Sequence, residues 1–146
     1  MVKIRVETDP HLESPDNEII LNIASYLFNS KDVYNFEISF VFGDDNLLNS
    51  LKKEFFKLDE LTDVIAFRIN DYSEKNIEGE IYISIPRAKE NAKKFTQPFK
   101  KEMGRLIIHG CLHLLGFEDT SDDQKAEMTK LEDYYLDKID WEKIYA

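Results

Sequence analysis

The chain has 146 residues, of which 42% are hydrophobic and 33% charged, and it contains five glycines and four prolines. This composition supports a well-filled core, so we expect residues 1–146 to form a single domain, and it excludes a disordered or low-complexity chain. The formal net charge of −10 argues, on totals alone, against RNA or DNA as a partner, because phosphate binding depends on cations.

The first half of the chain alternates strand-like and helix-like segments. The segment from Val2 to Glu7 is typical of an edge strand, and Ser14-Pro15-Asp16 predicts a helix start with the serine as N-cap and the proline in the first turn. Apolar and polar residues alternate from Phe36 to Phe42, which predicts a strand. Apolar residues recur at helical spacing from Asn46 to Phe56, so we expect a second helix there.

The second half of the chain is mostly helical. Val64 to Arg68 and Glu80 to Ile85 are typical of two further strands, and Pro86 is expected to end the sheet. Three helices are predicted after it, over about Arg87 to Phe95, Pro98 to Leu115 and Asp122 to Lys138. Four early strands and late helices predict an α+β fold, in which a small four-stranded mixed sheet packs against about five or six helices.

Two of the three histidines lie four residues apart in the helix predicted over Pro98 to Leu115. On a helix His109 and His113 project from one face, so their imidazoles can hold one cation. Gly116 follows three residues later, where a helix ends in a left-handed cap and the chain turns back. That turn can bring Asp119 or Glu118 to the same ion. The spacing therefore predicts a metal site of two histidines and one carboxylate in the C-terminal half.

Such a ligand set leaves a coordination position free for water, as in catalytic rather than structural zinc sites. One zinc ion per chain is therefore expected, and iron is an alternative because non-haem iron oxygenases use the same ligand types. We expect His11, in a polar loop, to be solvated. Cys111 lies about 200° around the helix from His109, so we expect it to point away from the ion.

The spacing also invites comparison with metzincin-type metalloproteases, which read His-Glu-x-x-His-x-x-Gly-x-x-His and use the glutamate as general base. This chain has Gly110 in the glutamate's place. A metallopeptidase is therefore a secondary hypothesis. Phosphodiester hydrolysis, which relies mainly on an activated water and charge neutralisation, is feasible without that glutamate.

From His109 to Asp119 the chain reads His-Gly-Cys-Leu-His-Leu-Leu-Gly-Phe-Glu-Asp. This stretch resembles the signature His-Gly-x-Leu-His-Leu-x-Gly-Tyr-Asp-His of the bacterial YbeY endoribonucleases, also called rRNA maturation factors. Two upstream segments are similar to family strands: Thr62 to Phe67 to Thr-Asp-Val-Leu-Ser-Phe, and Gly79 to Ser84 to Gly-Asp-Ile-x-Ile-Ser. The resemblance covers about residues 47–128 and identifies the chain as a YbeY-like metallohydrolase.

The resemblance implies a zinc-dependent, single-strand-specific endoribonuclease that matures ribosomal RNA, notably the 3′ end of the small-subunit RNA, and acts in ribosome quality control. Its partners would be ribosomal RNA and the small ribosomal subunit, with no DNA or membrane partner. By transfer, the metal ligands would be His109, His113 and Asp119, the last in place of the family's third histidine. His109 and His113 would act in catalysis through the bound ion and its water. The general acid or base is not identified; Asp63 and Glu80 are candidates because carboxylates at strand ends can reach a site.

The chain departs from the family upstream of Thr62. The family often carries a Tyr-Arg pair linked to catalysis, and this chain has Phe55-Phe56 at those positions. Phe56 thus replaces the family arginine. Either Lys57 or Arg105 would have to contact the phosphate instead.

The charge is unevenly distributed along the chain. Residues 87–105 carry a local net charge of +5, whereas the segments on either side are acidic or uncharged. A cationic strip beside a metal motif is what a phosphodiester substrate needs, so RNA becomes plausible despite the total. The candidate RNA contacts in this strip are Arg87, Lys89, Lys93, Lys94, Lys100, Lys101 and Arg105.

A non-catalytic RNA-binding module for ribosome assembly, with a structural metal, is the alternative function from another class. The location is expected to be cytoplasmic, because a single cysteine cannot form an internal disulfide and no apolar run near Met1 resembles a signal peptide. No segment approaches the roughly 18 consecutive apolar residues that suggest a membrane span.

Overall fold

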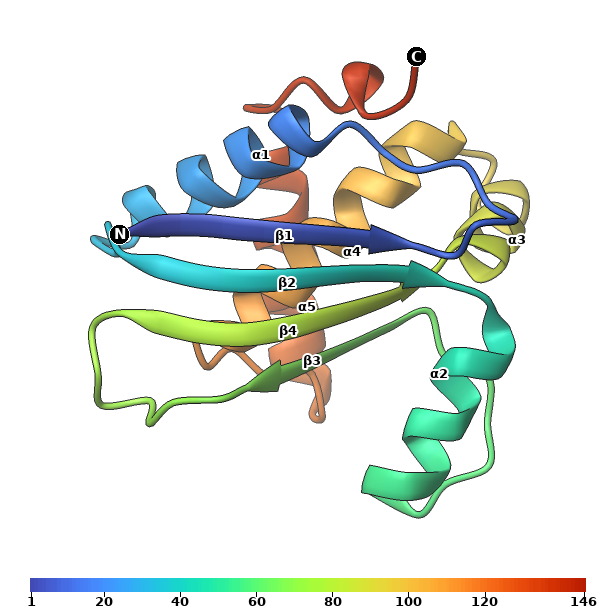
Figure 1. The fold of residues 1–146 in the computed structure, drawn as a ribbon, viewed down its shortest axis with the longest axis horizontal. Helices are drawn as coiled ribbons and strands as arrows, with labels where there is room; N and C mark the ends of the chain where they lie inside the picture. The colour runs from blue at the N-terminus through green and yellow to red at the C-terminus, as the bar shows by residue number, and fades with distance from the viewer.

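The computed structural model describes all of residues 1–146. It contains four strands, Val2–Thr8 (β1), Phe36–Gly43 (β2), Val64–Arg68 (β3) and Ile77–Ser84 (β4). They form one sheet in the order β1-β2-β4-β3, in which β1, β2 and β4 run parallel and β3 is antiparallel to β4 (Figure 1). The mixed four-stranded sheet predicted from the sequence is confirmed.

Five α-helices accompany the sheet: Asn17–Ser30 (α1), Asp45–Leu51 (α2), Ile85–Lys94 (α3), Phe99–Leu114 (α4) and Asp122–Leu136 (α5). A π-helical turn, Lys52–Phe56 (η1), continues α2, and a 3-10 turn, Trp141–Lys143 (η2), lies near the C-terminus. Figure 1 shows α4 and α5 passing behind the sheet, α1 above β1 and α2 projecting from the lower right corner. The α+β class is confirmed. Every helix is too short or too polar to serve as a membrane span.

Side chains alternate along β2 and β4, so one face of the sheet is apolar and the other is open. The helix-facing side chains are almost fully buried: Phe36, Ile38, Phe40 and Phe42 on β2 and Ile77, Ile81 and Ile83 on β4. Edge strand β3 lies beside the end of α4, where the Arg68 guanidinium donates to the Leu114 carbonyl at 2.7 Å. At this edge of the sheet, side chains of α4 and β3 therefore lie next to each other.

Several element boundaries differ from the sequence prediction, and at the starts of α1 and α3 the difference lies in the capping residue. Asp16 rather than Ser14 caps α1, and its side chain accepts a hydrogen bond from the Ile19 N–H. The hydroxyl of Ser14 lies 2.9 Å from that of Thr8 instead. Strand β4 begins at Ile77 rather than Glu80 and ends at Ser84, which caps α3. The helix therefore starts one residue before Pro86.

The helix predicted over Asn46 to Phe56 is divided in two. Regular α2 ends at Leu51, and the wider π-helical turn η1 carries the chain on to Phe56. Lys57, with φ of 57°, then ends the turn in a left-handed conformation. A π-helical turn rotates its side chains relative to a regular helix, and such turns are frequent at functional sites.

Candidate metal centre

Helix α4 presents His109 and His113 on one face, as their four-residue spacing predicts. The two Nε2 atoms lie 3.0 Å apart. Both side chains are partly buried, with 14% and 28% of their surface exposed. Burial, reinforced by the neighbouring His109, lowers the pKa of His113. The neutral imidazole that a metal ion requires is therefore favoured.

The chain turns back sharply after α4. Gly116 has a φ of +105°, the left-handed conformation predicted for it. The Phe117 N–H donates to the Leu112 carbonyl at 3.1 Å, and the Gly116 N–H donates to the His113 carbonyl at 3.0 Å. Together these bonds form a Schellman motif, which ends the helix and satisfies its last carbonyls. The reversal of the chain places Asp119 beside the two histidines.

Asp119 completes a group of three residues that could hold a metal ion. One of its carboxylate oxygens lies 3.4 Å from Nε2 of His109, and the other lies 3.6 Å from Nε2 of His113. A tetrahedral zinc ion with bonds of about 2.0–2.1 Å holds its ligand atoms roughly 3.4 Å apart. The observed separations therefore fit a metal ion of this kind. Glu118, the other predicted candidate, is exposed and lies outside the group.

Glu132 of α5 supports this group from behind. Its Oε2 atom lies 2.6 Å from Nδ1 of His109, and the residue is only 4% exposed. A carboxylate in this position accepts a hydrogen bond from the Nδ1–H group, and this tautomer leaves the lone pair of Nε2 free to bind an ion. Glu132 faces α4 because it belongs to the buried stripe of α5, between Met128 and Tyr135.

Arg105, one turn before His109, lies in a buried ion network. Its guanidinium contacts Glu102 at 2.6 Å and Glu132 at 3.2 Å, and it lies 3.8 Å from Asp63. Burial opposes the charge of Arg105, but the hydrogen bonds and charges of Glu102 and Glu132 outweigh burial and raise its pKa. Three carboxylates therefore engage Arg105, and its contact with Glu132 helps to hold that side chain in place.

The ligand group opens into a cavity of about 380 Å³ along β3. Its lining comes from four segments: Lys52 and Phe56 of η1, Thr62 to Ala66, His109 and His113 of α4, and Asp119 and Thr120. Asp63, one predicted acid or base, lines this cavity, and its carboxylate accepts a hydrogen bond from Asn91 at 2.9 Å. Glu80, the other, lies on the open face of the sheet beside Tyr82.

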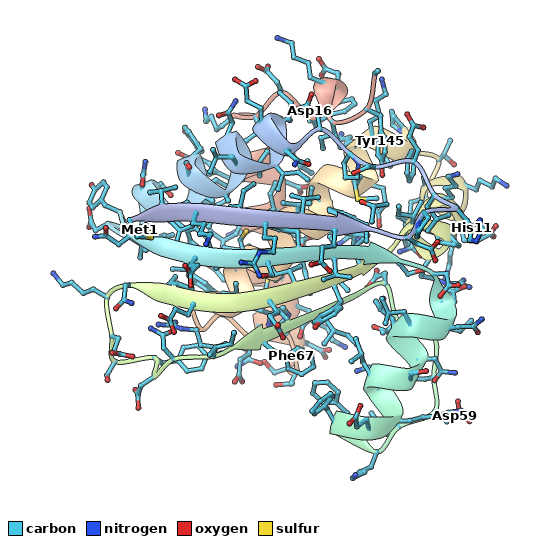
Figure 2. All side chains as sticks on the ribbon, viewed as in Figure 1. Met1, His11, Asp16, Asp59, Phe67 and Tyr145 are labelled. Atoms are coloured by element: carbon cyan, nitrogen blue, oxygen red, sulfur yellow. The ribbon has the colours of Figure 1, made fainter.

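The basic strip over residues 87–105 does not line this cavity. Arg87 pairs with Asp45 at 2.9 Å, and Lys100 donates to the main-chain carbonyl of Glu142 at 3.2 Å. The other members lie on α3 and at the start of α4: Lys89, Lys93, Lys94 and Lys101. Lys57 also lies outside the lining and donates to the carbonyl of Glu54. His11 is exposed in the loop after β1, as predicted (Figure 2).

Three charged residues near the ligands were not identified from the sequence: Lys52, Glu102 and Glu132. For the two glutamates a signal exists, since each lies on the apolar stripe of its helix, where a charge needs a partner. Lys52 has no comparable signal, because nothing in the sequence distinguishes it from the adjacent Lys53.

Gly110 occupies the position of the glutamate in metalloproteases, and it faces the sheet. A Cβ atom there would lie 2.7 Å from Cγ2 of Ile81, so no larger side chain fits. The glycine lets α4 pack closely against β4, and this packing determines how near the two histidines lie to the sheet. A general base of the metalloprotease type has no room at this position. Cys111, next along the helix, is fully buried, and burial raises its pKa.

Comparison with known proteins decides the family. A family model described as Endoribonuclease YbeY matches residues 5–140. The chain belongs to the YbeY endoribonuclease family. The resemblance first noted in the motif from His109 to Asp119 is thereby confirmed, and the chain is assigned to a family of enzymes that hydrolyse RNA.

Curated YbeY relatives match along most of the chain. Endoribonuclease YbeY of Flavobacterium psychrophilum is 39% identical over 93% of this chain and 94% of its own length. The protein of the same name from Amoebophilus asiaticus is 36% identical over 88% of this chain and 86% of its own length. A third, from Chloroherpeton thalassium, is 46% identical over 68% of this chain and 70% of its own.

A solved structure supports the fold. The solution structure of TM1509 from Thermotoga maritima superimposes on this YbeY chain with a TM-score of 0.61. The match covers 92% of this chain and 87% of that one, at 24% sequence identity. At this level of identity the similarity concerns the architecture of sheet and helices.

Proposed function

We propose that this chain is a zinc-dependent endoribonuclease that cleaves single-stranded RNA in the cytoplasm. Its substrate is ribosomal RNA, near the 3′ end of the small-subunit RNA, and its wider role is ribosome quality control. The names of the curated relatives support an RNA substrate. The observation that carries the proposal is the group His109, His113 and Asp119 on the wall of one cavity, with ligand atoms 3.0 to 3.6 Å apart.

The chain's own residues prepare this site before substrate arrives. Glu132 fixes the ring of His109 through Nδ1, and the Schellman turn fixes Asp119, so two imidazoles and a carboxylate converge without rearrangement. When bound, a zinc ion supplies a Lewis acid for a phosphate oxygen and lowers the pKa of a coordinated water.

Asp63 is our candidate for the general base. It lines the cavity, its side chain is 30% exposed, and Asn91 and Arg105 hold its carboxylate. A carboxylate fixed at the cavity wall can accept a proton from the water that attacks the phosphate. We assign this role to Asp63 rather than to Glu80, because Glu80 lies on the open face of the sheet.

RNA outside the cavity would meet the remaining lysines of the basic strip. Arg87, Lys100 and Arg105 are engaged with protein groups. We therefore retain four members as peripheral RNA contacts: Lys89, Lys93, Lys94 and Lys101. Such contacts act by releasing counterions from phosphate, so salt is expected to weaken them.

The test combines metal content with cleavage. Purified wild type and His113→Ala are compared for zinc per chain by elemental analysis and for cleavage of a single-stranded ribosomal RNA fragment. Wild type is expected to hold one zinc per chain and to cleave, and His113→Ala is expected to lose both properties. His11→Ala is the matched control, because His11 is exposed and lies outside the site; it should behave as wild type.

Two results would overturn the proposal. Cleavage by zinc-free His113→Ala would show that the ligand group is not catalytic. Zinc retention with no cleavage, together with loss of the fold on chelation, would instead favour the non-catalytic module with a structural metal. Circular dichroism before and after chelation separates these cases, because the enzyme's fold rests on its apolar core and should survive metal removal.

A further inference from the structure

The turn η1 carries two lysines and two phenylalanines, and only one of each lines the cavity. Lys52 and Phe56 are part of the lining, whereas Lys53 and Phe55 are not. The two lining residues lie four positions apart, so the turn presents them together, and the ammonium of Lys52 lies 4.8 Å from the centroid of the Phe56 ring. A cation and an aromatic ring therefore share the wall that the metal-binding group also lines.

Lys52 is the one lysine or arginine that lines this cavity. Its side chain is 20% exposed and forms an ion pair of 3.5 Å with Glu60, whose own side chain is 54% exposed. Solvent weakens an ion pair of this kind, so a phosphate can replace Glu60. Arg105, the other cation near the ligands, is held by three carboxylates. Lys52 is therefore the cation available to an anion beside the ligand group.

Phe56 is a large apolar residue left 45% exposed. Its ring is supported by the β3 residue Phe67, at 6.0 Å between centroids and an interplanar angle of 21°. Phe67 is anchored in turn by Phe55 at 5.2 Å and Tyr82 at 5.9 Å. Figure 2 shows Phe67 at the sheet edge that faces this turn. The ring thus packs against Phe67 and lines the cavity beside the ammonium of Lys52.

We propose that Lys52 and Phe56 form a nucleotide subsite next to the ligand group, an inference that rests on the proposed function. Lys52 binds a phosphate that flanks the scissile bond, and Phe56 stacks against the base of the same nucleotide. Movement of the ammonium from the ring to the phosphate exposes the ring face that the base then covers. Because a base in a duplex is already stacked on both faces, the subsite accepts unpaired nucleotides.

The composition of the cavity favours RNA over a protein as the occupant of this wall. A protein partner would cover the exposed apolar residues of this region together, including Phe55, Leu58 and Leu61, which are 57%, 47% and 57% exposed. Of these exposed apolar residues, Phe56 alone lines the cavity together with Lys52 and the metal-binding group. The two occupants therefore predict different effects for substitution of Leu58 and of Phe56.

The experiment uses matched pairs of variants of the metal-loaded protein. Steady-state cleavage of a single-stranded RNA oligonucleotide is measured for Lys52→Gln against Lys53→Gln. Lys53 is the control because it is the adjacent lysine, also ion-paired, at 3.7 Å from Asp59, and lies outside the cavity. Lys52→Gln is expected to raise KM about tenfold and to reduce the salt dependence of kcat/KM by about one phosphate contact. The KM of Lys53→Gln should stay within about twofold of the wild-type value.

Phe56→Ala is compared in the same way with Leu58→Ala, because Leu58 is similarly exposed, lies just after the turn and is outside the cavity. We expect Phe56→Ala to lower kcat/KM about tenfold, within the range of one base stack. An abasic nucleotide is then placed in turn at each position beside the cleavage site. At one position it should lower the kcat/KM of wild type to that of Phe56→Ala. At the same position it should leave the kcat/KM of Phe56→Ala unchanged. Phe56→Trp keeps a stacking ring, should retain wild-type kcat/KM, and should show fluorescence quenching on RNA addition. It keeps the test valid if Phe56→Ala does not fold.

The outcomes separate this inference from the function on which it rests. If wild type cleaves RNA while each cavity variant matches its control, the subsite is wrong and the proposed function stands. If Leu58→Ala and Phe56→Ala leave oligonucleotide cleavage intact but both impair processing within a ribosomal particle, the surface binds protein and the subsite is again wrong. If wild type neither binds nor cleaves RNA, the proposed function fails, and the subsite fails with it.

Discussion

The two walls of the cavity differ in how firmly the fold holds them. The ligand wall comprises His109, His113 and Asp119, backed by Glu132, which is 4% exposed. The η1 wall comprises Lys52 and Phe56 on a short π-helical turn, most of whose residues are exposed. A metal site needs ligands fixed before the ion arrives, whereas a site for flexible RNA can adjust to its substrate. The difference indicates a rigid wall that could hold a metal ion, facing a more adaptable wall that suits the proposed RNA subsite.

The strongest test of the rigid wall is Glu132→Ala. The change removes the acceptor from His109 Nδ1 and from the Arg105 guanidinium at a buried position. We expect the free energy of unfolding to fall by about 3 kcal/mol and zinc affinity to fall about 10- to 100-fold. Urea denaturation of the metal-free protein measures the first quantity, and zinc competition against a chelator measures the second.

Two further variants define the cause of that loss. Glu132→Gln keeps the volume and an acceptor oxygen, so it should recover much of the zinc affinity. Glu127→Ala is the control, because Glu127 lies on the exposed side of the same helix. This substitution should change the free energy of unfolding by less than about 0.5 kcal/mol. If Glu132→Ala resembled Glu127→Ala, the ligand wall would be no more rigid than the η1 wall.

A smaller effect is expected at the turn that returns Asp119. Gly116 has a φ of +105°, which an alanine adopts only with strain, so Gly116→Ala should lower stability by about 1 kcal/mol. Zinc affinity should fall several-fold, because the turn carries one ligand while the other two stay on α4. Gly116→Asn should be milder in both assays, since asparagine tolerates left-handed backbone better. Equal effects of the two substitutions would count against a backbone cause.

The smallest effect concerns the base of the η1 wall, where Asp45 of α2 pairs with Arg87 of α3. The Arg87 hydrogen bond holds the pKa of Asp45 below its usual value. A lowered pKa in the folded state adds stability above the unfolded-state pKa of about 4, and that stability is lost as pH falls through the folded-state pKa. Asp45→Asn should cost at most ~1 kcal/mol at pH 7, since solvent screens the pair.

Thermal unfolding of wild type and Asp45→Asn between pH 7 and pH 3 measures this contribution. The difference between the two proteins should shrink as the pH falls below about 4. A difference that stays constant over this range would mean that Asp45 supports α2 by packing rather than by charge.

The ligand wall could be predicted from the sequence because its parts are local. His109, His113, Gly116 and Asp119 belong to one helix and the turn after it, so helical spacing and a glycine cap determine their arrangement. The same holds for the sheet, since strict alternation along β2 defines its buried face.

The remaining parts depend on contacts between distant segments. Glu132 meets His109 only because α5 packs against α4, and Lys52 lines the cavity because η1, β3 and α4 come together there. The assignment of the α1 cap to Ser14 was wrong, because Ser14 and Asp16 both suit an N-cap and tertiary contacts choose between them. Arg105 was expected to face a phosphate, but three carboxylates from separate segments surround it.

The most direct test of the account is a zinc titration of metal-free wild type, with bound zinc and RNA cleavage measured on the same samples. If His109, His113 and Asp119 hold the catalytic ion, cleavage will rise in proportion to bound zinc and reach its plateau at one zinc per chain. Full cleavage without zinc, or one tightly bound zinc with no cleavage, would contradict the central claim.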